Sequence, residues 1–287
     1  MKRQPDITPA LDGLSVGDAF GAAFERLPFD TIRRREPPPG PWRWGDATST
    51  ALATAAALGD GIDPARLAAE LGDRYRAWPW RAPRDGSEPV LMRIAAGDDW
   101  RIAAGSAAAA GSAAAARGVV VGAAYHGEPA RAAGEARRAA EVTHGDGEAQ
   151  AGAMAVAAAA ALTGPGAPKG GDFLAAVLPH VPTGEVHARL EAAAGLGPDR
   201  FVIAERVLGT GRRRRAVDTV PFALWVVAWH RDYEDAAWLA AAGMGDRPTL
   251  LALVGGLVAA WSPPPAAWRA AREPLTAPPS GALHAAP

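Results

Sequence analysis

The segment that most restricts the fold of this chain is residues 11–25, LDGLSVGDAFGAAFE, in which a glycine recurs at every fourth position. In a helix, Gly13, Gly17 and Gly21 lie near one face, because residues four apart are neighbours on the helix surface. A helix face that lacks side chains lets a neighbouring backbone or a ligand approach to contact distance. We therefore expect a helix from about Thr8 to Phe24, capped by Thr8, that packs closely on another element or borders a ligand.

Glu25 closes this segment, directly after Ala22, Ala23 and Phe24. A carboxyl group in partly apolar surroundings has a raised pKa and is suited to donate a proton. The position of Glu25 therefore predicts a catalytic acid or base at the end of the first helix.

The composition favours an all-α fold. Hydrophobic residues make up 49% of the 287 positions, enough for a sizeable core, and alanine dominates them. Alanine favours helix, whereas the alternation of β-branched and aromatic residues typical of strands is hardly present. We expect a compact single-domain helical bundle over residues 8–270, with a flexible arm at 1–7, a disordered tail at 271–287, and some of the 10 tryptophans as large core anchors.

Charge and cysteine content exclude several classes of function. The formal net charge is −1, so the composition provides no general attraction to nucleic acid or to an anionic membrane. The absence of cysteine excludes disulfides and thiolate metal sites. The first ten residues lack the apolar stretch of a signal peptide, and no apolar run is long enough for a membrane span. We therefore expect a cytoplasmic protein with neither nucleic acid nor a membrane as a partner.

A proline-rich loop extends from about Leu27 to Trp44 and is either a substrate lid or a surface connection. The second candidate segment follows this loop. The segment reads Trp44-Gly-Asp-Ala-Thr and continues into an alanine-rich helix. Asp46 is a suitable helix N-cap, which is its structural interpretation. Farther along, Trp78 and Trp80 flank a proline and either line a base pocket or belong to the core.

Five later segments are also candidates. Gly111 to Arg117 opens an alanine helix, and a glycine-serine start there suits an anion or needs no ligand at all. His144 lies at a helix boundary, where a cap, a core histidine and a ligand contact are all open. The four arginines at 212–215 either bind a diphosphate or form a solvated surface. The last two segments are VDTVPFALWVVAWH at 217–230 and GMGDRPT at 243–249, which precedes another apolar helix.

These segments, in this order, resemble the ADP-ribosylglycohydrolase family, which includes ADP-ribosyl-acceptor hydrolases and dinitrogenase reductase-activating glycohydrolases. Residues 17–25 match its G-D-A-x-G-x-x-x-E pattern, and the resemblance extends over nearly the whole chain. It implies that Glu25 is the catalytic glutamate and that Asp46 takes part in catalysis. It further implies contacts of the protein with an ADP-ribose-like ligand through Trp44, Gly111, Ser112, His144 and Asp146.

The family patterns T-D-D-T and G-G-D-x-D-T imply a pair of magnesium or manganese ions held by six side chains. In this sequence Gly45, Ala47 and Pro248 replace three of the six. The remaining oxygen ligands are Asp46, Asp246 and Thr249, and the Thr48 hydroxyl is a possible fourth ligand. Because Mg²⁺ takes about six oxygens, we expect at most one weakly bound ion here, or none.

Three functions follow from the resemblance. The first is an enzyme that hydrolyses an ADP-ribosyl or NAD-derived N- or O-glycosidic bond with an incomplete metal site, and the retained Glu25 favours it. The second is a catalytically inactive protein that binds ADP-ribose or a related nucleotide, which the missing metal ligands favour. The third is a biosynthetic enzyme that uses the same fold on another metabolite.

Overall fold

The computed structural model describes residues 6–25, 29–105 and 109–275. In these three ranges the chain forms sixteen α-helices, two short 3-10 helices and no strand, and the expected all-α fold is confirmed. The α-helices are α1 Thr8–Phe24, α2 Phe29–Arg33, α3 Asp46–Ala57, α4 Pro64–Ala77, α5 Glu88–Ala95, α6 Trp100–Gly105, α7 Ala113–Ala124, α8 Pro129–Glu141, α9 Gly147–Ala161, α10 Gly170–Val177, α11 Glu185–Ala194, α12 Phe201–Leu208, α13 Ala216–Trp229, α14 Tyr233–Ala242, α15 Arg247–Val258 and α16 Ala266–Ala271.

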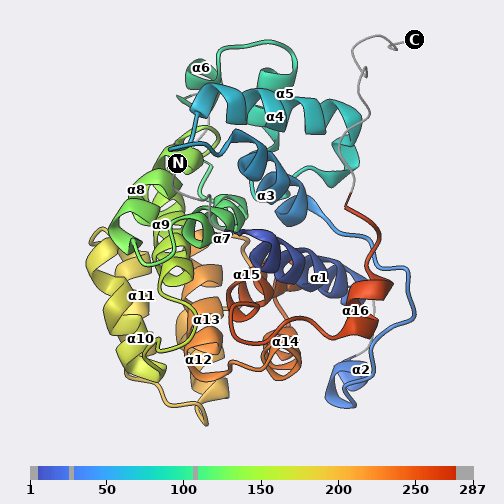
Figure 1. Ribbon diagram of the computed structural model, residues 1–287, viewed down its shortest axis with the longest axis vertical. Helices are drawn as coiled ribbons and strands as arrows, with labels where there is room; N and C mark the ends of the chain where they lie inside the picture. The colour runs from blue at the N-terminus through green and yellow to red at the C-terminus, as the bar shows by residue number, and fades with distance from the viewer. Residues whose placement is uncertain (1–5, 26–28, 106–108, 276–287) are drawn as a thin grey trace.

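The centre of the molecule is the contact between the first helix and the fifteenth, α1 and α15 (Figure 1). A Cβ atom added to Gly17 would lie 2.1 Å from the Leu251 carbonyl oxygen, and one added to Gly13 would lie 2.3 Å from that of Gly255. The glycine face of α1 therefore meets a backbone rather than a ligand. The helix has the expected bounds, although Ile7 and not Thr8 occupies the N-cap position.

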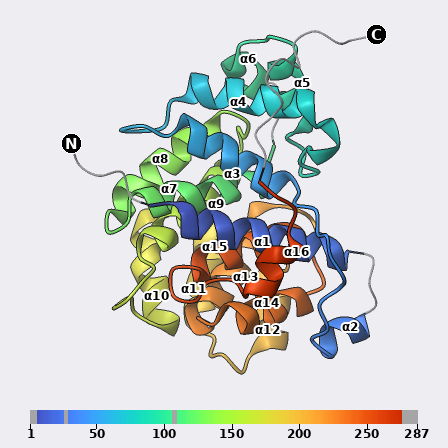
Figure 2. The same ribbon diagram turned by 45° about the vertical axis from the view of Figure 1, so that its right-hand side comes forward.

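A second close helix pair stands beside the first. Helices α7 and α9 pack so tightly that a Cβ at Gly122 would lie 2.3 Å from the Ala157 carbonyl oxygen. Alanine and glycine let these backbones approach, and the long apolar helix α9 is almost entirely buried. Figures 1 and 2 both show α4, α5 and α6 gathered at one end of the molecule beyond α3, with α10, α11 and α12 at the opposite end.

Aromatic side chains fix the chain segments around α1, as the tryptophan content led us to expect. Phe20 of α1 stacks on Trp268 of α16 with ring centroids 4.0 Å apart, and it also contacts Trp42 and Trp238 at 5.2 and 5.1 Å. This cluster joins α1, α14 and α16 to the segment that precedes α3.

The segment after α16 pairs with the segment before α3. The Trp42 N–H donates to the Ala271 carbonyl at 2.7 Å, and the Glu273 N–H donates to the Trp42 carbonyl at 2.9 Å. Residues 271–274, the beginning of the expected disordered tail, thus pack on the segment before α3. The rest of the expected disordered tail, residues 276–287, lies outside the described residues. The same holds for residues 1–5, which make up most of the expected flexible arm.

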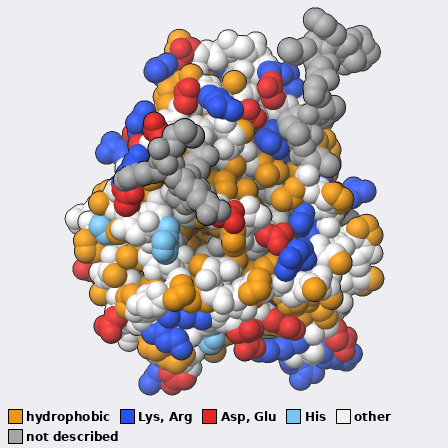
Figure 3. Space-filling view, viewed as in Figure 1, with side chains coloured by type: hydrophobic (Ala, Val, Ile, Leu, Met, Phe, Trp, Pro, Cys, Tyr) orange, Lys and Arg blue, Asp and Glu red, His pale blue; other side chains and the backbone are white. Residues whose placement is uncertain are grey.

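The proline-rich stretch before α3 contains one short helix, α2, where only a loop was expected. The prolines at 37–41 come after the end of this helix, so none of them removes a backbone N–H donor from it. On the face drawn in Figure 3, basic and acidic side chains are interspersed, in line with the near-zero net charge. No helix in the described ranges combines the length and the apolarity needed to cross a membrane.

Candidate functional site

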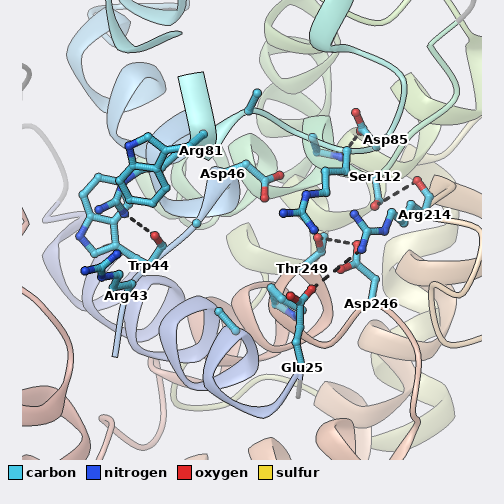
Figure 4. A pocket seen from close by; sticks show the side chains of 17 residues that line it. Glu25, Arg43, Trp44, Asp46, Arg81, Asp85, Ser112, Arg214, Asp246 and Thr249 are labelled. Carbon is cyan, nitrogen blue, oxygen red and sulfur yellow. Dashed lines mark hydrogen bonds and ion pairs between the residues drawn. The ribbon is translucent and has the colours of Figure 1, made fainter. Parts of the chain in front are cut away.

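A cavity of about 200 Å³ lies where the ends of several helices meet. Glu25, the C-cap residue of α1, lines it together with Asp46, the first residue of α3. Asp246 at the start of α15 and Ser112 at the start of α7 lie on the same wall as Arg214, from the loop before α13. Figure 4 shows Glu25, Asp246 and Arg214 together on one side of this pocket, with Asp46 facing it from α3.

The start of α3 is capped by a side chain of α1, which the sequence did not suggest. Asp18 Oδ2 accepts hydrogen bonds from the Gly45 N–H at 2.8 Å, the Thr48 N–H at 2.9 Å and the Thr48 hydroxyl at 2.6 Å. Asp46 was expected to be this cap and is not: it is the first helical residue, and Gly45 holds the N-cap position. The carboxylate of Asp46 is therefore free to face the pocket (Figure 4).

Burial controls the protonation of these two aspartates. It raises the pKa of Asp18 to about 6 against the opposing hydrogen bonds from Thr48 and Gly45. Burial, followed by the negative charges of Asp18, Asp246 and Asp85, raises the pKa of Asp46 well above its ordinary value. Asp46 therefore retains its proton to a higher pH than an exposed aspartate does.

Asp246 occupies the N-cap position of α15 and lines the same pocket as Asp46. Its Oδ2 accepts a hydrogen bond from the Thr249 hydroxyl at 2.8 Å. Burial raises the pKa of Asp246, while the Thr249 hydrogen bond and the positive charge of Arg214 oppose that rise.

Glu25 does not have the apolar surroundings that its neighbours in sequence suggested. Its side chain is 42% exposed, and Oε1 lies 3.9 Å from Nη2 of Arg214. The helix ends at Phe24, so the Glu25 carboxylate extends past α1 toward the arginine. Its environment is a polar pocket edge, with Arg214 as an ion-pair partner.

Asp85 is a pocket residue that the sequence analysis did not select. It lies in the loop before α5, and its Oδ2 accepts from the Ala113 N–H at 2.7 Å, at the start of α7. Oδ2 also lies 3.1 Å from His144 Nε2. A Cβ on Gly111 would come within 2.0 Å of this carboxylate, so Gly111 makes room for Asp85 and does not itself line the pocket.

His144 is fully buried beneath Asp85 and does not line the pocket either. Arg117 Nη2 donates to the Thr143 hydroxyl oxygen at 2.6 Å, and that hydroxyl is 2.7 Å from His144 Nδ1. Because an ionised carboxylate can only accept a hydrogen bond, we assign a proton to His144 Nε2, directed at Asp85. Burial alone would raise the pKa of Asp85, but the hydrogen bond and charge of His144, with donors from Ser87 and Ala113, hold it well below the ordinary range.

The remaining candidates divide between the pocket and its surroundings. Asp146 caps α9, accepting from the Glu148 and Ala149 N–H groups at 2.9 and 3.0 Å, and does not border the pocket. Thr48 is buried against Asp18, outside the lining. The candidates that do line the pocket are Glu25, Trp44, Asp46, Ser112, Asp246 and Thr249.

An arginine stacked between two tryptophans forms the far wall of the pocket. The guanidinium carbon of Arg81 lies 3.4 Å from the centre of the Trp44 ring and 4.2 Å from that of Trp80. Glu273 fixes this stack, because its Oε1 accepts from Arg81 Nη2 at 2.7 Å and from the Trp44 N–H at 3.0 Å. Trp80 is 58% exposed and lines the pocket, whereas Trp78 does not.

The donor atoms at this pocket do not fit the metal pair that the family resemblance implies. The hydroxyls of Thr48 and Thr249 both donate to aspartates. Gly45, Ala47 and Pro248 have no side-chain oxygen. Across the described parts of the chain, no three histidine, aspartate or glutamate side chains are grouped in a way that could hold a metal ion.

Fold and site together define an all-α protein with a carboxylate-lined pocket between helix ends. A sequence model of the ADP-ribosylglycohydrolase family matches residues 2–278. Among solved structures, the chain is similar to one described as an ADP-ribosylglycohydrolase-related protein complex, with 29% sequence identity, coverage of 95% of this chain and 93% of that chain, and a TM-score of 0.63. No curated protein sequence matches the chain. The chain belongs to the ADP-ribosylglycohydrolase family.

Proposed function

We propose that this protein hydrolyses an ADP-ribosyl or NAD-derived N- or O-glycosidic bond in the pocket described above. One observation carries the proposal: Glu25, Asp46 and Asp246 come from the ends of three different helices and line one cavity. Two carboxyl groups on either side of a sugar are the usual means of cleaving a glycosidic bond. Membership of the ADP-ribosylglycohydrolase family supports an ADP-ribosyl group as the substrate class.

The different surroundings of the two carboxyl groups suggest how they divide the work. Asp46, with its raised pKa, holds a proton that it can give to the leaving atom of the glycosidic bond. Glu25, at the solvent edge, accepts the proton of the water that attacks the ribose. Asp246 and Ser112 then hold ribose hydroxyls, and Trp44 and Trp80 contact the rest of the ligand.

The test is the hydrolysis rate of Glu25→Gln with three substrates: an ADP-ribosyl group on an arginine nitrogen, one on a serine oxygen, and NAD. The released ADP-ribose is quantified by chromatography. Removing a general base or acid lowers kcat by roughly 10²–10⁴-fold. Glu36→Gln, a change at an exposed glutamate outside the pocket lining, is the matched control and should keep the wild-type rate. A Glu25→Gln variant as active as the wild type contradicts the proposed role of Glu25.

The second candidate function is a protein that binds ADP-ribose without cleaving it. The missing oxygens at Gly45, Ala47 and Pro248 favour this function, because they remove the family's metal ligands from both walls of the pocket. Calorimetry with ADP-ribose, combined with the rate measurements, separates the two. Binding with no turnover of any of the three substrates supports the binding protein.

A further inference from the structure

The loop before α13 holds one arginine in a backbone conformation that favours glycine. Arg214 has φ of 53°, in the left-handed region, which costs about 1–2 kcal/mol for a residue with a Cβ. The loop is held in place on both sides: the Asp218 carboxylate accepts from the N–H groups of Arg213 and Arg215 at 3.0 and 3.1 Å. The surrounding contacts therefore impose this conformation on Arg214.

This conformation separates Arg214 from the other arginines of its run. Arg214 lines the pocket with Glu25, whereas the other three line a different cavity of about 490 Å³. Its backbone carbonyl accepts from the Ser112 N–H at 3.1 Å, which ties the loop to the start of α7. The turn thus delivers one guanidinium into the carboxylate pocket (Figure 4).

The guanidinium lies beside the carboxylates of two helices. Nη2 is 3.9 Å from Glu25 Oε1, and the positive charge favours the ionised form of Asp246. Arg214 is only one-third exposed, so its charge is partly shielded from water. Among the described residues, no group of side chains in this pocket could hold a metal ion.

We infer that Arg214 takes the place of a metal ion in this pocket, balancing Glu25 and Asp246 and binding the diphosphate of an ADP-ribosyl ligand without a metal. A guanidinium is always charged, and its planar set of N–H donors matches phosphate oxygens. The ligand part of this inference depends on the proposed ADP-ribosyl substrate class. The charge-balancing part concerns the protein alone and can be tested without that ligand.

The first experiment is a titration with Mn²⁺, followed by the electron paramagnetic resonance signal of the free ion. The wild-type protein should bind Mn²⁺ at least about tenfold more weakly than Arg214→Gly, because removing a cation a few ångströms away removes about 1.4 kcal/mol of repulsion. Glycine accepts the positive φ, so the variant keeps the loop. Equal or weaker Mn²⁺ binding by Arg214→Gly overturns the inference.

The second experiment is calorimetry with ADP-ribose, in EDTA and in excess Mg²⁺. The wild type should bind equally well in both buffers, and Arg214→Gly should bind at least about tenfold more weakly in EDTA, the loss expected for a charged hydrogen bond. Arg214→Lys retains the charge without the planar set of donors and should fall between them. Arg213→Ala, next in the chain but lining the other cavity, should bind like the wild type.

Each outcome decides one of the two proposals. Wild-type binding that requires Mg²⁺, or undiminished binding by Arg214→Gly, overturns the role of Arg214. A wild-type protein that binds no ADP-ribose in either buffer overturns the proposed substrate class, and the Mn²⁺ titration then still decides whether Arg214 stands in for a metal.

Discussion

Asp18 accepts a 2.6 Å hydrogen bond from the Thr48 hydroxyl across the contact between α1 and α3. The same oxygen caps the first turn of α3, and Oδ1 is buried with no hydrogen-bond partner. The Asp18 carboxylate of α1 therefore holds the start of α3 in position. This link sets the direction in which Asp46 faces.

The Asp18 carboxyl should make the protein less stable as the pH rises. Its folded-state pKa of about 6 exceeds the ordinary value of 3.8, so the folded state binds this proton more tightly than the unfolded chain does. Its stabilising contribution is complete below pH 3.8 and is lost as the pH rises through 6. That loss amounts to about 3 kcal/mol at neutral pH.

Asp18→Asn tests this expectation, because an amide oxygen can still accept from Thr48 but does not titrate. Urea unfolding should be measured for both proteins at several pH values. Between about pH 4 and 7.5 the wild type should lose up to about 3 kcal/mol relative to the variant. Two curves that stay parallel over that range would show that Asp18 is not buried as described.

The glycine face of α1 should not tolerate a methyl group. In Gly17→Ala the new Cβ would have to occupy space 2.1 Å from the Leu251 carbonyl oxygen, so α1 and α15 must separate. We expect a loss of about 3 kcal/mol or more in the free energy of unfolding, at the upper end for overpacked cores. Chemical denaturation measures it.

Gly134→Ala is the matched control for this prediction. Gly134 lies within α8, and a Cβ there meets no atom within 4 Å. Alanine in an exposed helix interior should stabilise the protein by about 0.5–1 kcal/mol. If both substitutions changed stability equally, close backbone contact would not be the reason for the glycines of α1.

The contacts of α1 show which parts of the fold could be predicted from sequence. Four-residue glycine spacing is a local property of a helix, so the bounds of α1 and its close packing followed from the residues alone. The partner, α15, comes more than 200 residues later and could not be identified by periodicity. The short helix α2 was also missed, since a short segment carries little periodic signal.

In the candidate site, the residues that line the pocket were more predictable than those that support it. Glu25, Asp46 and Asp246 line the pocket from helix ends, where sequence motifs can be recognised. Asp18 and Asp85 were not selected, because their partners lie 27 to 59 residues away in the chain. Gly111 and His144 were recognised as special positions, but their contacts are with Asp85 rather than with the cavity.

Glu273 should prove important for the tryptophan wall although it follows the last helix. Glu273→Ala removes the acceptor shared by Arg81 and the Trp44 N–H, and it should lower the free energy of unfolding by about 1–3 kcal/mol. Glu273→Gln keeps one acceptor oxygen and should recover part of this loss. Thermal unfolding compares the two, and an alanine variant as stable as the wild type would mean that Arg81 stacks on Trp44 without this support.

Asp85 should show a pH dependence opposite to that of Asp18. His144 and the Ala113 N–H hold the pKa of Asp85 below the unfolded value of 3.8, so its contribution to stability is present above that pH and is lost as the pH falls below it. Asp85→Asn should cost about 3 kcal/mol at neutral pH, because His144 loses a buried charged partner. In urea unfolding, the difference in free energy of unfolding between wild type and Asp85→Asn should become smaller below about pH 4. The corresponding difference between wild type and Asp18→Asn should become larger as the pH rises above about 4. If the two variants showed the same pH trend, the assignment of a charged Asp85 beside a buried His144 would be wrong.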